Sequence, residues 1–130
     1  MSVVRPSTGT WEEQAVRGLA WARIGLGVVA LVVPSVPAKP WVGADAARTS
    51  TQTLARALGA RDLALGLGTV LASRHRAPVR GWLEACALSD AGDALTTLIG
   101  WRSRPKLGRL GVLGAAAGGA IACGVLARRT

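Results

Sequence analysis

The chain has 130 residues, half of them apolar, with 17 glycines, five tryptophans and neither phenylalanine nor tyrosine. Its formal net charge is +9, from 16 basic against 7 acidic residues. The charge alone suits nucleic-acid binding, but most basic residues lie in short segments between apolar runs, and no nucleic-acid recognition motif accompanies them. We therefore expect no nucleic-acid partner, and a lipid bilayer instead.

The apolar runs predict an all-α protein with four transmembrane helices. Short basic turns separate the last three helices, so neighbours run antiparallel in an up-down-up-down bundle with both termini on one side. We expect residues 1–130 to form one multi-pass domain in the cell membrane. Lys and Arg are balanced between the two sides, so the sequence leaves the orientation open. The expected helices cover residues 11–33, 50–72, 79–101 and 106–127.

Local signals support the expected boundaries. Thr10 and Glu13 form a capping box ahead of the first helix, and three prolines in the connection over residues 34–50 prevent that helix from continuing. In the third helix, Trp82 and Trp101 lie about 28 Å apart, close to the ~30 Å thickness of a bilayer's hydrocarbon core. Tryptophan favours both membrane interfaces, so this spacing fits a helix that spans the bilayer.

Five ionisable residues lie near the middle of the expected helices, where a bilayer disfavours charge most. Each costs about 2.5–3.5 kcal/mol at the bilayer centre, so five unpaired charges would cost on the order of 15 kcal/mol. We therefore expect these side chains to face one another across the first three helices, with the fourth helix as a mainly apolar support. The predicted network consists of Arg23, Arg61, Asp62, Asp90 and Asp93.

Two interpretations of this network remain open. It fixes the register of the helices, because buried ionic groups can serve specificity alone, or it binds a small molecule, an ion or a proton, because intramembrane ionisable groups are often functional. The excess of one carboxylate would leave one of them protonated or bound to a cation. The first interpretation gives a structural or accessory membrane component, and the second gives a transporter or ligand-binding bundle.

Small residues predict where helices approach one another closely. Gly59 and Gly66 share a face with Asp62, which indicates that a partner helix packs against this face. Gly114 and Gly118 form a GxxxG motif in the last helix. For that motif we leave open packing inside the bundle and the seam of a homodimer or a larger membrane complex.

The sequence shows no motif for catalysis, a metal or a cofactor, and we expect none of the three. The only histidine, His75, lies in a basic turn. Cys86 and Cys123 lie inside apolar runs without a CxxC motif, so we expect them to be small buried residues.

Three elements together resemble a known family. They are Gly59-x-Arg61-Asp62, Asp90-x-x-Asp93, and Arg23 followed by glycines and a proline stop. Over residues 15–127 the chain resembles a bacterial family of small four-helix membrane proteins of unknown function, loosely similar to DoxX-like proteins. The resemblance implies a membrane location and a four-helix fold, and it implies no established reaction.

Overall fold

The computed structural model describes residues 10–130, and this part of the chain is helical with no β-strand. The prediction of an all-α protein is confirmed. The long helices begin and end within a few residues of the expected positions. The α-helices are α1 (Trp11–Val32), α2 (Ser35–Val42), α3 (Thr49–Arg74), α4 (Arg80–Ile99) and α5 (Lys106–Arg129), with short 3-10 helices at Gly43–Ala47 and Trp101–Ser103.

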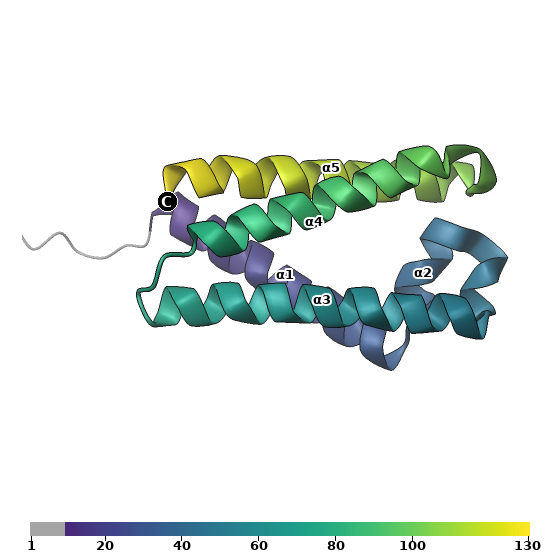
Figure 1. Cartoon of the computed structure of the whole chain (residues 1–130), viewed down its shortest axis with the longest axis horizontal. Helices are drawn as coiled ribbons and strands as arrows, with labels where there is room; N and C mark the ends of the chain where they lie inside the picture. The colour runs from purple at the N-terminus through teal and green to yellow at the C-terminus, as the bar shows by residue number, and fades with distance from the viewer. Residues whose placement is uncertain (1–9) are drawn as a thin grey trace, which may run out of the picture.

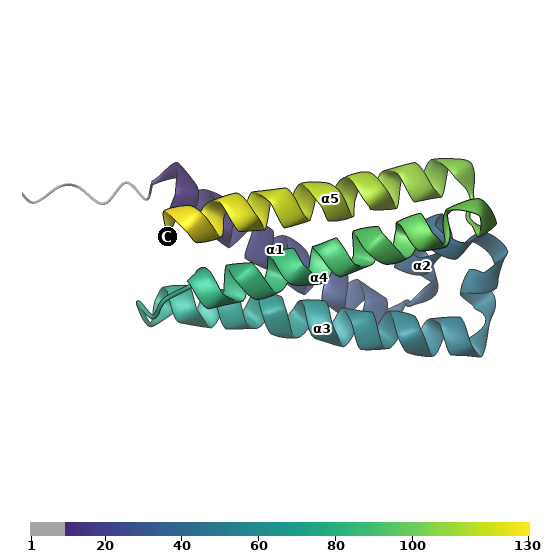
Figure 2. The same cartoon turned by 45° about the horizontal axis from the view of Figure 1, so that its top comes forward.

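The four long helices lie side by side and alternate in direction along the chain (Figure 1). α1 packs mainly against α3, and α4 packs mainly against α5, while the two pairs touch each other much less (Figure 2). The start of α1, the α3–α4 turn and the C-terminus share one end of the molecule, here called the terminal end. α2 and the α4–α5 turn lie at the opposite end, here called the distal end.

Glycines allow α1 and α3 to approach closely. A Cβ on Gly27 would lie 2.6 Å from the Gly59 carbonyl oxygen, and a Cβ on Gly59 would lie 2.6 Å from the Ala30 Cβ. Further along, a Cβ on Gly66 would lie 2.7 Å from the Ala20 carbonyl oxygen. The partner of the small-residue face predicted on α3 is therefore α1, and any side chain at these glycines would force the helices apart.

Residues 34–50 differ from the plain connection that we expected, because they contain the helix α2. Pro34 precedes this helix and Pro37 lies in its first turn, where backbone N–H groups have no partner within a helix and proline removes nothing. Gly43 ends α2 with a φ of 62°, a left-handed conformation that glycine adopts without strain. Pro40 lies inside α2 and removes one backbone donor there, yet the helix continues to Val42, so the prolines interrupt the chain after α1 without preventing a new helix.

α2 closes the distal end of the bundle. The Trp41 indole Nε1 donates a hydrogen bond of 3.2 Å to Thr97 Oγ1 on α4, and Thr97 is fully buried. On α5, a Cβ added to Gly108 would overlap the Pro40 carbonyl. At the terminal end, the space between the helices is filled by an apolar cluster instead. This cluster contains the buried residues Val16, Leu83, Leu126 and Ala127.

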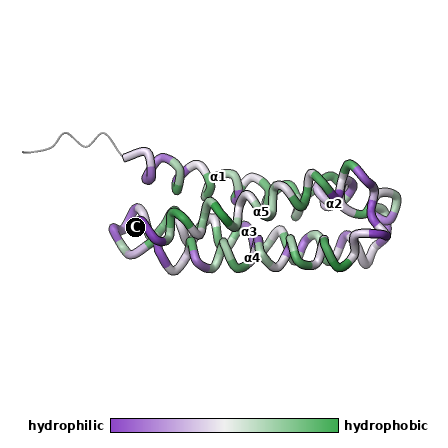
Figure 3. The backbone as a smooth tube through the Cα atoms, turned by 90° about the horizontal axis from the view of Figure 1, so that it is seen from above, coloured by the Kyte–Doolittle hydropathy of each residue, from purple (hydrophilic) through white to green (hydrophobic). Residues whose placement is uncertain are grey.

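Among the described residues, α1 and α5 are long and apolar enough to cross a membrane. α3 and α4 are less apolar over such a length, because each carries two residues of the predicted network as well as flanking charges. Hydrophilic residues gather at the terminal and distal ends of the helices (Figure 3). Length and composition thus support two candidate membrane spans.

Candidate functional site

Arg23 lies midway along α1 and joins three helices. Its Nη1 donates to Asp62 Oδ1 on α3 at 2.8 Å, and its Nη2 donates to Asp90 Oδ2 on α4. The same Nη2 also lies 3.4 Å from the carbonyl oxygen of Cys86. One guanidinium therefore links two carboxylates from separate helices, in an environment where its side chain is only 12% exposed.

Arg61 makes the second link between α3 and α4. Its Nη1 and Nη2 bind the two oxygens of Asp93 at 3.1 and 2.8 Å, a bidentate pairing that fixes both the distance and the orientation of the groups. Nη2 also lies 3.4 Å from Asp62 Oδ1, which connects this pair to Arg23. The structure thus brings all five sequence-predicted residues into one continuous ionic network.

The network lies between the two helix pairs, whose backbones come close at far fewer points than those of the helices within each pair. Arg23, Arg61 and Asp62 belong to the α1–α3 pair, and Asp90 and Asp93 belong to the α4–α5 pair. Charge-assisted hydrogen bonds join the pairs across the middle of the molecule, and apolar contacts, among them Trp82 against Gly68, join them nearer the terminal end.

α5 contributes more to this region than the apolar support expected from the sequence. A Cβ on Gly119 would overlap the carboxylate of Asp90, so the glycine leaves the space that this carboxylate occupies. Cys123 on α5 contacts Cys86 on α4 through its thiol and lies beside Arg23. Both cysteines are free and buried, as expected, but no local pattern predicts their contact, because 36 residues and a turn separate them.

The aspartates bound by Arg23 are less exposed than the Arg61–Asp93 pair. The side chains of Asp62 and Asp90 are 10% and 12% exposed, whereas those of Arg61 and Asp93 are 32% and 26% exposed. The Arg61–Asp93 pair borders a groove of about 500 Å³ between α3 and α4. Arg61 Nε and Ser89 Oγ are buried near this groove and have no hydrogen-bond partner among the residues described. Apolar residues, including Leu65 and Leu88, line much of the remaining wall.

The GxxxG motif of α5 does not pack inside the molecule. A Cβ added to Gly114 or Gly118 would meet no other atom within 4 Å, and both glycines lie on the exposed surface of α5. Of the two interpretations left open for this motif, packing within the bundle is therefore wrong. Contact with a second copy or another membrane protein stays a prediction.

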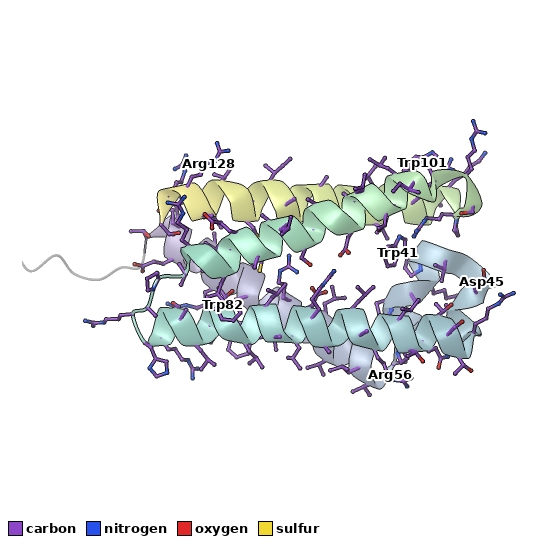
Figure 4. The ribbon with its side chains drawn as sticks, viewed as in Figure 1. Trp41, Asp45, Arg56, Trp82, Trp101 and Arg128 are labelled. Atoms are coloured by element: carbon purple, nitrogen blue, oxygen red, sulfur yellow. The ribbon has the colours of Figure 1, made fainter. Side chains whose placement is uncertain are left out.

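Aromatic and basic side chains meet at both ends of the bundle. At the distal end, the guanidinium of Arg104 lies 4.7 Å from the Trp41 ring and that of Arg109 lies 4.5 Å from the Trp101 ring. At the terminal end, the Arg129 guanidinium lies 5.2 Å from the ring of the tryptophan that begins α1. Burial lowers the pKa of the Arg104 guanidinium. Figure 4 shows Trp41 and Trp101 at one end of the helices and Trp82 and Arg128 at the other.

The chemistry available at the network is that of ion pairing and hydrogen bonding. In residues 10–130, no three His, Cys, Asp or Glu side chains are grouped so that they could hold a metal ion.

Comparison with known proteins finds no match to the chain among protein-family models, curated proteins or solved structures. The arrangement of the network is therefore the main evidence on function.

Proposed function

We propose that the chain is a multi-pass membrane protein that crosses the bilayer four times, and that its charge network fastens the two helix pairs together. In this role it is a structural or accessory component of the cell membrane rather than an enzyme. The resemblance to small four-helix membrane proteins agrees with this proposal.

One observation carries the proposal: the charged residues in the middle of α3 and α4 are all paired, with Asp62 and Asp90 buried and Arg61 and Asp93 partly buried. Apart from the partly exposed Arg61–Asp93 pair, the surface between the flanking charges is uncharged over residues 57–73 of α3 and 85–99 of α4, about 25 Å and about 22 Å of helix. Such a surface suits the hydrocarbon core of a bilayer. Hydropathy averaged along a helix does not show this, because it counts paired charges as if they faced lipid. The exposed residues of α4 in this span are Ala85, Leu88, Ala91, Gly92, Leu95, Thr96, Leu98 and Ile99.

Labelling of introduced cysteines from each side of the membrane tests the four crossings. In a background where Cys86 and Cys123 are changed to alanine, we would compare His75→Cys in the α3–α4 turn with Ser103→Cys in the α4–α5 turn. Four crossings place these positions on opposite sides, so an impermeant maleimide should label only one of them in sealed vesicles. If only α1 and α5 cross, both positions react from the same side and the proposal fails.

A second candidate function is the binding of a small lipid-soluble ligand or an ion at the groove between α3 and α4. The observation that favours it is the partial exposure of the Arg61–Asp93 pair, together with the unpartnered Arg61 Nε and Ser89 Oγ. The network also has one more carboxylate than it has guanidinium groups, which suits a bound proton or cation.

Asp93→Asn separates the two candidates. Mass spectrometry would identify small molecules and ions that co-purify with the wild type and with the variant. If Asp93→Asn inserts and unfolds like the wild type but loses a bound species, the groove binds a ligand and the purely structural role is wrong. If the variant fails to assemble and the wild type carries no bound species, the ligand candidate loses its support.

A further inference from the structure

A second groove, of about 450 Å³, lies between α1 and α3 near the terminal end of the molecule. Val16, Ala20 and Val70 supply apolar surface to its wall, and the indole of Trp21, which is 51% exposed, borders it. Two basic side chains, one from each helix, complete the lining. They are Arg17 and Arg74, and the hydroxyl-bearing residues Thr69 and Ser73 lie beside them.

Unlike Arg80 and Arg129 at the same end, these two arginines have no anionic partner in the described part of the chain; Arg76 and Arg128 also have none there but lie outside the groove. Arg80 pairs with Glu84 at 2.8 Å, and Arg129 lies 3.7 Å from Glu12. Within residues 10–130, neither Arg17 nor Arg74 makes a hydrogen bond or an ion pair, and both are exposed. Two guanidinium groups therefore border one groove with their hydrogen-bonding capacity free.

The position of the groove along the helices indicates which kind of anionic ligand would bind there. If the helices cross a bilayer, the terminal end lies at the level of the lipid headgroups, where tryptophan and arginine are favoured. A ligand there needs a negative group for the arginines and an apolar tail for the wall formed by Val16, Ala20 and Val70. A phospholipid with a net negative headgroup has both parts in this order, and basic pockets between membrane helices bind such lipids.

We propose that the groove between α1 and α3 binds an anionic phospholipid, with its phosphate between Arg17 and Arg74 and an acyl chain along the apolar wall. This inference rests on the proposed membrane location. A zwitterionic lipid would bring a cationic choline or amine toward the same arginines, so the groove prefers a headgroup such as phosphatidylglycerol over phosphatidylcholine.

Native mass spectrometry of the full chain in a neutral detergent tests the preference. Phosphatidylglycerol and phosphatidylcholine with the same acyl chains would be titrated into the wild type, into Arg17→Gln/Arg74→Gln, and into Arg76→Gln/Arg128→Gln. The last variant removes the same charge from exposed positions at the same end but outside the groove. We expect the groove variant to bind phosphatidylglycerol about 25-fold more weakly, about fivefold for each arginine, and the control to stay within about twofold of the wild type.

Two results would overturn the inference: equal binding of both lipids by the wild type, or equal loss of binding in both double variants. The same preparation also shows whether the protein is a membrane protein at all, separately from whether the groove binds lipid. A chain that remains in the aqueous phase after membranes are removed and detergent is omitted is not a membrane protein. A chain that stays with membranes but shows no lipid preference refutes only the groove.

Discussion

Replacing Arg23 with glutamine tests the central role of the network most directly. The substitution keeps a polar side chain of similar length but removes the charge that pairs with Asp62 at 2.8 Å and with Asp90. Asp62 retains Arg61 at 3.4 Å, whereas Asp90 has no other basic side chain within ion-pair distance in the described part of the chain. Asp90 is then a buried carboxylate without a counterion.

Removing one partner of a buried pair typically costs 3–5 kcal/mol, because the remaining charge stays buried and uncompensated. Asp90 is 12% exposed and can take up a proton, so we expect the lower end, about 3 kcal/mol. The matched control is Arg80→Gln, which breaks the exposed Arg80–Glu84 pair and should cost about 0.3–0.5 kcal/mol.

The measurement is the free energy of unfolding in detergent micelles, followed by circular dichroism during titration with sodium dodecyl sulfate. Adding Asp90→Asn to Arg23→Gln should recover part of the loss, because the second change removes the unpaired charge. Equal stability of Arg23→Gln and Arg80→Gln would refute the view that this network holds the helix pairs together.

Three further predictions concern packing. Gly59→Ala should destabilise the protein by about 1–3 kcal/mol, because the new Cβ would lie 2.6 Å from the Cβ of Ala30. Gly118→Ala should stabilise it by about 0.5–1 kcal/mol, because that Cβ would meet open space. If unfolding titrations find Gly118→Ala less stable than Gly59→Ala, the α1–α3 contact is contradicted. Gly108→Ala should displace α2 and speed hydrogen exchange over residues 35–47, while Gly111→Ala, where nothing lies within 4 Å, should not. The two buried cysteines should react with maleimide slowly in the folded protein and rapidly after unfolding, and fast labelling of folded protein would show that this contact is open.

The sequence was sufficient for the long helices and for the composition of the network. The cost of unpaired charge in a bilayer predicted that Arg23, Arg61 and the three aspartates would meet, whatever the details of packing. Hydropathy also located α1 and α5, because their apolar runs are long. The positions of the apolar helices and the pairing of the charges both involve energies of several kcal/mol, so few other arrangements of the chain would be stable.

Other features depended on contacts that no local pattern encodes. α2 forms although Pro34 precedes it and Pro37 and Pro40 lie within it, because it docks on α4 and α5, so tertiary packing overrides a local signal against helix. The GxxxG motif did not reveal which surface it faces, since a small-residue face can pack inside a chain or outside it. Which carboxylate pairs with which arginine was also open until the rotation of each helix was known.

The separation of the network between the helix pairs has a consequence for assembly. The α1–α3 half contributes two positive charges and one negative charge to the interface, and the α4–α5 half contributes two negative charges. If the helices cross a bilayer as proposed, each half alone would hold a net charge within the lipid, of opposite sign to that of the other half. In that case, fragments divided at the α3–α4 turn and synthesised separately should attract each other within the bilayer, so the opposite charges would favour association of the two helix pairs.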